Sequence, residues 1–233
     1  MSSSRISHRS TSRQPARTRR AAPRDGETTA EAVARYVRKL IFEGRLVAEQ
    51  RLPQDEIALA VGVSRIPVRE AIILLEREGW LRVESHRGAF ILPLDERAIT
   101  DRFELYGRFY GFAARRAIDH LGPDDVEALG ALAKDVDRAK SAAAMERANT
   151  GYLAKLVSLA ASNRLRTVLR SSEQIVPGNF FAAVPNSIPA AKSGIAALHA
   201  AVVAGDADAA ERASVEMQGE QAKSVVAMTR SRD

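Results

Sequence analysis

Two arginines lie at the start of an apolar helix in the segment GVSRIPVREAIILLEREGW, residues 62–80. Arg65 and Arg69 are four residues apart, so both side chains project from one face of that helix, one turn apart. The apolar residues that repeat on its opposite side are Val68, Ala71, Ile72 and Leu75. A guanidinium group can donate paired hydrogen bonds to phosphate oxygens or to O6 and N7 of guanine. The spacing therefore predicts a helix that is buried on one side and offers two cations to a partner on the other.

Short elements on either side must hold this helix in place. Apolar residues recur at helical spacing over 31–42, and a second short helix is expected over 55–61. Gly62 turns the chain, and Ser64 suits the N-cap because its hydroxyl can accept a free N–H of the first turn. WLRVE and AFILP alternate as two strands across the connection SHRG, where Gly88 can take a positive φ. This order of elements predicts a winged helix-turn-helix.

The chain beyond this region is rich in alanine, the best helix former, and shows no strand pattern. Helices are expected over 96–120, 123–148, 151–171, 190–204 and 206–228. Phe180 and Phe181 interrupt the helical pattern and are expected to be core residues. The predicted fold class is mainly α: an N-terminal winged helix-turn-helix followed by an all-helical bundle.

We expect four segments along the chain, and its charge is concentrated in the first of them. They are a disordered basic tail at 1–26, a winged helix-turn-helix domain at 27–93, a linker at 94–98 and a helical effector-binding and dimerisation domain at 99–230. The net charge of the chain is +6. Residues 1–24 contain seven arginines and no acid, so the rest of the chain has 28 basic and 29 acidic residues. Such an arm predicts either contact with nucleic acid or a gain in solubility.

The composition disfavours other classes of protein. There is no cysteine, and no stretch approaches the roughly 20 apolar residues that span a bilayer, so we expect a cytoplasmic protein with no membrane partner. There is also no Gly-rich phosphate loop and no G-x-S-x-G motif, and the four histidines are scattered at 8, 86, 120 and 199. We therefore predict that the protein is not an enzyme and has no catalytic residue and no cofactor.

The segment RLPQDEIALAVGVSRIPVREAIILLEREGWLRVESHRGAFILPL resembles the DNA-binding domain of the GntR family of bacterial transcription regulators, over about residues 30–93. The elements RLP, VGVSR, PVREA and RGAF stand in the order that the family shows. AASNRL at 160–165 and AVVAGDADAAERA at 201–213 are similar to the FCD-like ligand domain of the FadR-type branch. The resemblance implies a sequence-specific transcription regulator, most simply a repressor, whose operator binding is modulated by a small molecule.

The resemblance also implies a DNA interface and a partner. The implied contact residues are Ser64, Arg65, Pro67 and Arg69 on the helix, with His86, Arg87 and Gly88 in the wing. The implied assembly is a homodimer on a palindromic double-stranded operator. One position departs from the pattern, because many members have a DNA-contacting arginine where this chain has Asp55. An acid repels phosphate, so we expect that contact to be lost and the operator preference to differ.

Many FadR-type ligand domains hold a metal ion with one Asp and three His, and this chain lacks that set. Alignment of the helices puts Thr150 and Ala154 at the first two ligand positions, and Ile195 and Met217 at the later two. His199 alone is available nearby, whereas a zinc site needs three or four ligands. We therefore predict that the domain binds no metal.

The apolar replacements predict a different kind of effector. The family's carboxylate-binding arginine reads Tyr106 here, and Arg108 lies about 200° further round the helix. We expect the effector pocket to be lined by Tyr106, Phe109, Leu153, Ile195, His199 and Met217. Two interpretations stay open at this point. Either a hydrophobic ligand such as a fatty acyl derivative fills the pocket, or the domain serves dimerisation alone.

A rival function is that of a non-specific architectural DNA-binding protein, in which the basic tail supplies affinity and the helical domain only dimerises. Such a protein binds all sequences nearly equally, with a steep dependence on salt. A regulator instead prefers its operator over unrelated DNA by about 10³ or more.

Overall fold

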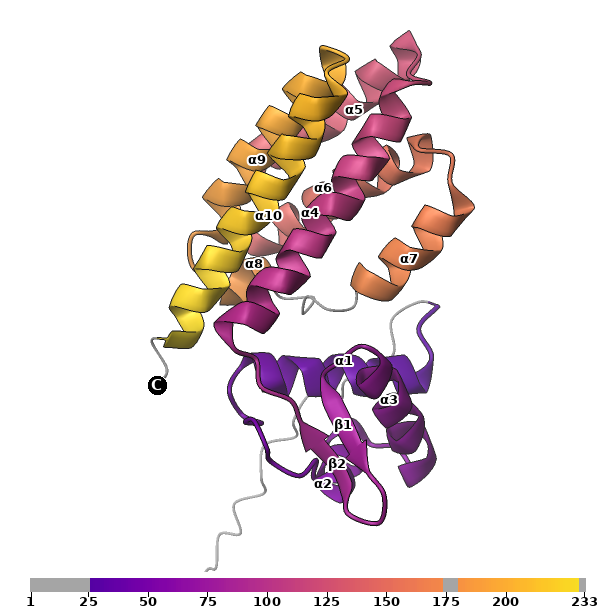
Figure 1. The fold of residues 1–233 in the computed structure, drawn as a ribbon, viewed down its shortest axis with the longest axis vertical. Coiled ribbons are helices and arrows are strands. Elements are labelled where there is room, and N and C mark those ends of the chain that lie inside the picture. The colour runs from indigo at the N-terminus through magenta and orange to yellow at the C-terminus, as the bar shows by residue number, and fades with distance from the viewer. Residues whose placement is uncertain (1–25, 174–179, 231–233) are drawn as a thin grey trace, which may run out of the picture.

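The computed structural model describes residues 26–173 and 180–230, which form two helical units stacked end to end (Figure 1). The N-terminal unit contains α1 (Thr29–Phe42), α2 (Gln54–Val61), α3 (Arg65–Arg77), β1 (Leu81–Glu84) and β2 (Gly88–Ile91). The strands pair antiparallel, with Leu81 opposite Ile91 and Glu84 opposite Gly88. The predicted winged helix-turn-helix and its place ahead of a helical bundle are therefore confirmed.

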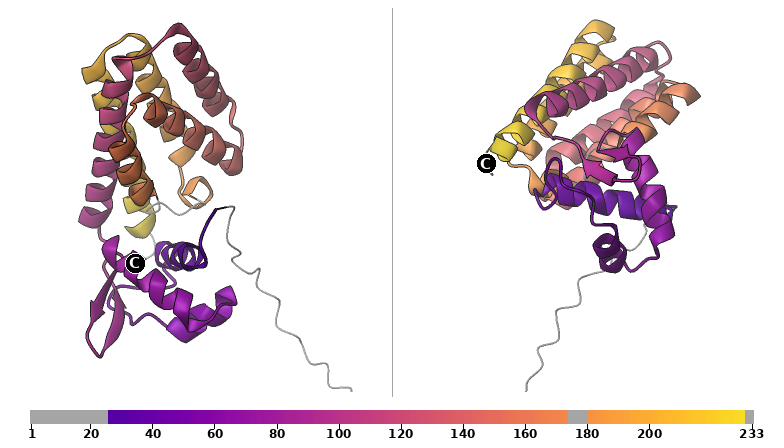
Figure 2. Two further views of the ribbon diagram at one scale, coloured as in Figure 1. Left: turned by 90° about the vertical axis from the view of Figure 1, so that its right-hand side faces the viewer. Right: turned by 60° about the horizontal axis from the view of Figure 1, so that its bottom comes forward.

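The bundle contains seven helices within the described residues. They are α4 (Glu96–Ile118), α5 (Pro123–Arg138), α6 (Ala142–Leu159), α7 (Asn163–Glu173), α8 (Phe180–Ala183), α9 (Ser187–Val203) and α10 (Ala207–Arg230). The two views of Figure 2 show α4 and α10 running side by side along the length of the bundle. Phe180 and Phe181 are buried, as predicted for core residues. No helix among the described residues is long and apolar enough to cross a membrane.

The predicted division of the middle helices is wrong. The chain breaks at 139–141 and 160–162, whereas the sequence pattern had placed a break near 149–150. Ser141 explains the first break, because its Oγ accepts a hydrogen bond from the Ala144 N–H at 3.2 Å and caps α6. Gly151, which looked like a helix start, lies inside α6 close to Leu132 on α5. An alanine-rich helix tolerates one interior glycine at a modest cost.

Part of the segment predicted as a linker, 94–98, is helical. Helix α4 begins at Glu96, and the Oδ1 of Asp95 caps it by accepting the Ala98 N–H at 2.8 Å. Residues 96–98 are therefore helical and belong to the bundle. The tail at 1–25 lies outside the described residues, so the division of the whole chain into domains stays a prediction.

Side chains of both units meet at the junction. Arg102 of α4 donates hydrogen bonds to the carbonyl oxygens of Glu78 and Gly79, at 3.1 and 3.2 Å, just after the end of α3. Its guanidinium lies 4.0 Å from the centre of the Trp80 ring. Burial lowers the pKa of Arg102, the direction expected for a cation removed from water. The first bundle helix is thus attached directly to the end of α3.

Candidate DNA interface and ligand domain

The turn between α2 and α3 sets the direction of α3. Gly62 ends α2 in the left-handed region, with φ 78° and ψ 41°, a conformation that costs glycine little. Ser64 then precedes α3 in extended conformation, but its side chain makes no capping hydrogen bond. The position of the N-cap is as predicted, whereas its expected hydroxyl bond is absent from the described contacts. The hydroxyl of Ser64 is exposed at the surface instead.

Helix α3 is buried along the side that the sequence indicated. Its buried residues are Val68, Ala71, Ile72 and Leu75. Arg65 and Arg69 are exposed on the other side, together with Ile66, whose side chain is 68% exposed. Pro67 is half-buried between the two faces. The first two turns of α3 therefore present two arginines, one branched apolar side chain and the carboxylate of Glu70 to the solvent.

Arg65 has an acidic partner that the sequence analysis had interpreted differently. Its Nε lies 2.7 Å from Oδ1 of Asp55, and its Nη2 donates to Oδ2 at 2.9 Å. Asp55 is on the first turn of α2, so the partner of Arg65 lies on the neighbouring helix and not on α3 itself. The Glu76 carboxylate accepts the Val83 N–H at 3.0 Å instead. For Arg69, no ion pair forms within the part of the chain that the structure describes.

The tip of the hairpin is basic and tightly turned. His86 has a positive φ of 61° and is exposed, and Arg87 pairs with Glu84 across the turn. Gly88 has a φ of 109°, and a Cβ there would lie 2.8 Å from the Nε of Arg51. The positive φ therefore favours glycine at this position, whereas the flexible end of the Arg51 side chain could move aside. Arg51 could not be recognised from the sequence. Its side chain lies close to Gly88 only because the backbone of Arg51 forms a bridge to Phe90 in the hairpin.

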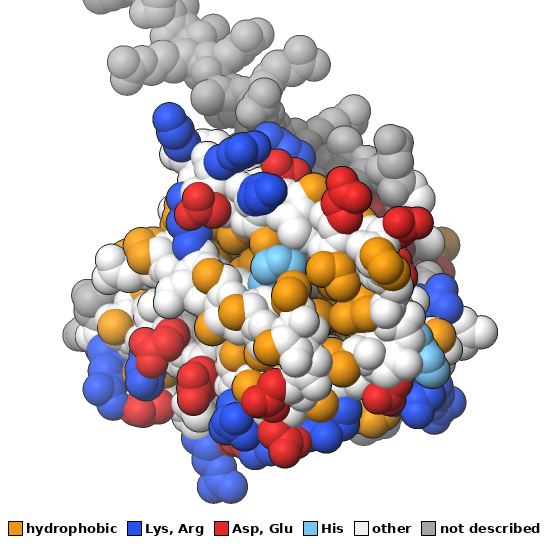
Figure 3. Space-filling model, turned by 90° about the horizontal axis from the view of Figure 1, so that it is seen from above, with side chains coloured by type: hydrophobic (Ala, Val, Ile, Leu, Met, Phe, Trp, Pro, Cys, Tyr) orange, Lys and Arg blue, Asp and Glu red, His pale blue; other side chains and the backbone are white. Residues whose placement is uncertain are grey.

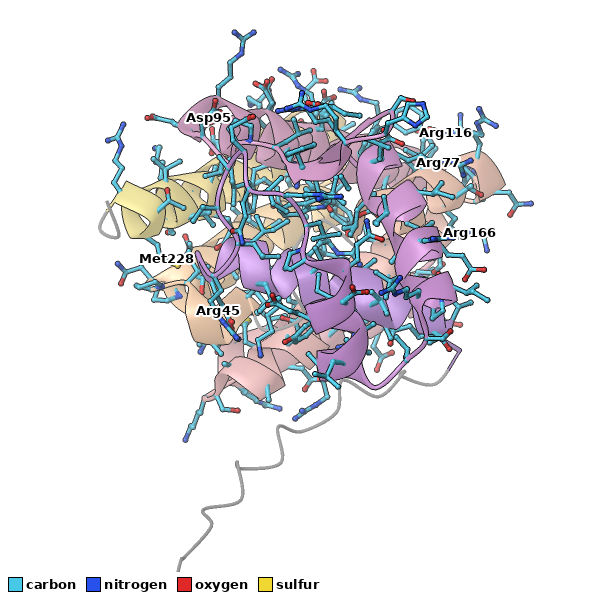
Figure 4. All side chains as sticks on the ribbon, turned by 90° about the horizontal axis from the view of Figure 1, so that it is seen from below. Arg45, Arg77, Asp95, Arg116, Arg166 and Met228 are labelled. Atoms are coloured by element: carbon cyan, nitrogen blue, oxygen red, sulfur yellow. The ribbon has the colours of Figure 1, made fainter. Side chains whose placement is uncertain are left out.

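Figure 4 shows the N-terminal unit from the end of the molecule opposite the bundle. Arg77, at the end of α3, and Arg45, in the connection before α2, lie on opposite sides of it. Arg77 is the last residue of α3, about 18 Å along the helix axis from Arg65. Arg77 is also exposed, so it offers the same charge as Arg65 and Arg69 at a place far from the N-terminal turns of the helix.

The six residues expected to line an effector pocket lie within or beside one apolar core. Tyr106, Leu153, Ile195 and Met217 are at most 5% exposed and belong to that core, and Phe109 packs against it. The Met217 side chain rests against Gly194 of α9, where a Cβ would lie 2.2 Å from its Cγ. These contacts place the residues in or beside the bundle interior, where a ligand pocket stays a prediction.

His199 is the polar member of this set, and its nearest polar partner was not predicted. The hydroxyl of Tyr152, a fully buried residue of α6, lies 3.4 Å from His199 Nδ1. Burial lowers the pKa of His199 and raises that of Tyr152, so both side chains are kept neutral. Figure 3 shows the end of the bundle far from the hairpin, where hydrophobic side chains gather in the middle of the face and charged side chains surround them.

A charged hollow of about 360 Å³ lies apart from these six residues, on the surface between α4 and α10. Arg108 borders it and pairs with Glu104 at 3.1 Å and with Glu211 at 3.9 Å. The Arg108 side chain is 58% exposed and turned toward these surface carboxylates. This agrees with the expectation that Arg108 does not replace an arginine inside the pocket.

Two family models match the two units of the chain. "Bacterial regulatory proteins, gntR family" matches residues 29–91, and "FCD domain" matches residues 102–218. The chain belongs to the GntR family of regulators with an FCD domain. The family is one of DNA-binding transcription regulators and not of enzymes, as the sequence analysis predicted.

Relatives and solved structures agree with this assignment. An uncharacterised HTH-type transcriptional regulator of Mycobacterium tuberculosis, Rv0043c, is 31% identical over 67% of this chain and 64% of its own length. The Nta operon transcriptional regulator of Aminobacter aminovorans is 30% identical over 54% of this chain and 61% of its own length. The matches thus span less than two thirds of these relatives. The structure of E. coli McbR/YncC has the same fold, with a TM-score of 0.60 and 17% identity over 88% of this chain and 99% of its own.

The structure shows how far the aligned metal positions on α6 are buried. Thr150 and Ala154, which had been placed at ligand positions, are exposed on α6 and face away from the interior. One residue earlier, Asn149 is half-buried and Leu153 is buried. Neither of these two residues is a carboxylate or an imidazole. Among the described residues no group of three or more His, Asp or Glu side chains is arranged to hold a metal ion, and the absence of a metal stays a prediction.

Proposed function

We propose that this GntR/FCD protein is a sequence-specific repressor that acts in the cytoplasm as a homodimer on a palindromic operator. The observation that carries the proposal is the exposed N-terminal half of α3, where Arg65 and Arg69 project from a helix whose other side is buried. A helix held in this way can enter the major groove with its first turns, where arginine reads guanine. Ser64 and Pro67 at the start of α3, and His86, Arg87 and Gly88 in the wing, complete the proposed contact surface.

We further propose that an apolar small molecule in the FCD domain modulates operator binding. Support comes from the buried apolar side chains of Leu153, Ile195 and Met217, and from the neutral Tyr152–His199 pair beside them. A ligand pocket of this kind is mostly apolar with a few polar groups that fix orientation. A fatty acyl chain fits that chemistry better than a small dicarboxylate.

The DNA part of the proposal is tested with operators selected from random duplexes. Arg65→Ala and Arg69→Ala are each expected to weaken operator binding by about 1–3 kcal/mol at fixed salt. Arg77→Ala is the matched control, because it removes the same charge from the exposed end of the same helix. Its effect on operator binding is expected to be small.

Unchanged operator affinity for both Arg65→Ala and Arg69→Ala would refute the contact assignment. Equal affinity of the wild-type protein for selected and unrelated duplexes would instead favour the architectural function. The homodimer is checked in the same samples by light scattering, with and without the palindromic duplex.

A further inference from the structure

Asp55 and Arg65 form an ion pair at the exposed ends of two helices. Asp55 is on the first turn of α2, and Arg65 is the first residue of α3. The Nε–Oδ1 and Nη2–Oδ2 distances are 2.7 and 2.9 Å, so the carboxylate binds the side of the guanidinium formed by Nε and Nη2. Both side chains are about 70% exposed, at 69% for Arg65 and 70% for Asp55. The pair therefore lies on the same open surface as the rest of the proposed DNA interface.

The geometry of the pair leaves two N–H groups of the Arg65 guanidinium free to bind a base. A guanidinium group has five N–H donors, one on Nε and two on each terminal nitrogen. The carboxylate occupies the Nε–H and one N–H of Nη2. The outer edge keeps one N–H on each terminal nitrogen, and these two are parallel. That outer edge is the one that can donate two hydrogen bonds to O6 and N7 of guanine.

The ion pair is too exposed to be important for the stability of the fold. Exposed pairs contribute little because water screens them and because long side chains lose freedom when they are held together. The freedom that Arg65 loses in the free protein, however, no longer has to be lost when DNA binds. The negative charge of Asp55 also disfavours a phosphate at this place, so the arginine is directed toward a base.

We propose that Asp55 is a positioning residue that orients Arg65 for guanine and so increases the preference of the protein for its operator. Asp55 acts through the arginine and touches no base itself. The inference rests on the proposed function, because it requires Arg65 to contact the operator. It differs from the loss of a contact that the sequence predicted, since the acid now strengthens recognition by its neighbour.

The experiment compares Asp55→Ala, Arg65→Ala and the double variant. Affinity is measured at one salt concentration for the selected operator, for an unrelated duplex and for the operator carrying 7-deazaguanine at the position read by Arg65. Asp55→Ala is expected to lower the ratio of operator to unrelated affinity about tenfold, with the affinity for unrelated DNA rising. In the Arg65→Ala background the same change is expected to leave the ratio unaltered. The loss caused by 7-deazaguanine is expected to shrink in Asp55→Ala.

Glu56→Ala is the matched control, since it removes an adjacent exposed acid from the same turn of α2. It is expected to raise affinity for all DNA equally and to leave the ratio unchanged. The inference is overturned if Asp55→Ala behaves like Glu56→Ala, or if its effect persists without Arg65. If Arg65→Ala itself leaves operator affinity unchanged, the contact proposed for Arg65 fails first. Thermal melting of each variant confirms that these exposed substitutions leave the fold intact.

Discussion

At the start of α3 the side chain of Arg65 is 69% exposed, whereas Ile195 on α9 is 1% exposed inside the FCD domain. The first site is built from residues that lie close together in the sequence, on two short helices joined by a turn. The second is assembled from helices that are far apart in the sequence, with Tyr152 meeting His199 across 47 positions. Changes in the first region should alter recognition at little cost in stability. Changes in the second should affect packing and, with it, the ligand binding proposed above.

Arg102 joins the two regions, and its removal should have the largest effect on stability. Arg102→Ala deletes two hydrogen bonds from a half-buried cation to the end of α3 and the stacking on Trp80. We expect a loss of about 2–4 kcal/mol in the free energy of unfolding, measured by urea denaturation. The unfolding transition should also become broader or divide in two, because the units lose their attachment.

Arg97→Ala is the control for Arg102→Ala, because Arg97 lies on the same helix and its side chain is 91% exposed. Its effect should stay within about 0.5 kcal/mol. If both variants unfold in the same way as the wild type, the junction does not depend on Arg102.

The comparison of the two regions also explains what could be predicted from the sequence. The winged helix-turn-helix follows from local patterns, and the buried side of α3 from Val68 to Leu75 was read correctly. The middle helices were divided wrongly because alanine and glycine give little contrast at helix ends. The pairing of Asp55 with Arg65 depends on how two helices meet and on side-chain rotamers. Neither determinant is visible in the spacing of residues.

The same reason applies to the FCD domain. Spacing alone did not show which side of α6 is buried: Thr150 and Ala154, aligned with two of the family's ligand positions, are exposed, whereas Leu153 is buried. A displacement of one residue turns a helix by about 100°, enough to exchange an inward for an outward position. Arg102 was missed because its partners, the carbonyl oxygens of Glu78 and Gly79, are backbone atoms of another unit.

Deletion of residues 1–24 should affect DNA binding without affecting sequence preference. The seven arginines of this segment, which lies outside the described residues, are expected to release counterions when they meet phosphate. Affinity for operator and unrelated duplexes should fall by the same factor, about tenfold near 0.1 M salt, and the salt dependence should flatten. Replacing the seven arginines by glutamine at full length provides the control for chain length. An unchanged salt slope would show that the tail does not touch DNA.

A substitution of Ile66 should show whether the exposed side of α3 also recognises thymine. Its side chain is 68% exposed beside Arg65, where it can contact the methyl group of a thymine. Ile66→Ala should weaken operator binding about three- to tenfold, in line with roughly 0.8 kcal/mol for each buried methylene. Replacing that thymine by deoxyuridine should weaken the wild type similarly and leave the variant unaffected. Ile73→Ala, two turns further along α3, is the matched control and should have little effect.

His199 should make stability depend on pH in a defined direction. Burial lowers its pKa below 6.5, so the unfolded chain binds this proton more readily than the folded one. Its contribution should therefore be constant above about pH 6.5 and should reduce stability as the pH falls below that value. His199→Gln should remove this part of the pH dependence of the melting temperature, whereas His120→Gln, at an exposed position, should retain it. If the melting temperatures of His199→Gln and the wild type depend on pH in the same way, His199 is not the source of this pH dependence.

The smallest expected effect is the response of the FCD domain to metal ions. The inward positions of α6, α9 and α10 hold Leu153, Ile195 and Met217, and His199 faces a tyrosine. A divalent cation needs several convergent oxygen or imidazole donors, and its binding would raise stability with metal concentration. We expect the melting temperature to be the same in Zn²⁺, Ni²⁺ and EDTA. About one equivalent of transition metal per chain, found by elemental analysis of untagged protein, would contradict this prediction.

Long-chain acyl compounds are the positive arm of the same measurement. If an apolar ligand occupies the interior, saturating amounts should raise the melting temperature, because only the folded chain binds them. Ile195→Asn places an amide in that interior and should abolish the rise, whereas Ala196→Asn, at the adjacent exposed position of α9, should keep it. Because Ile195→Asn also lowers basal stability, the shift is compared with each variant's own ligand-free value. If fatty acids and their thioesters leave both melting temperature and operator affinity unchanged, the acyl proposal fails and dimerisation remains as the role of the domain.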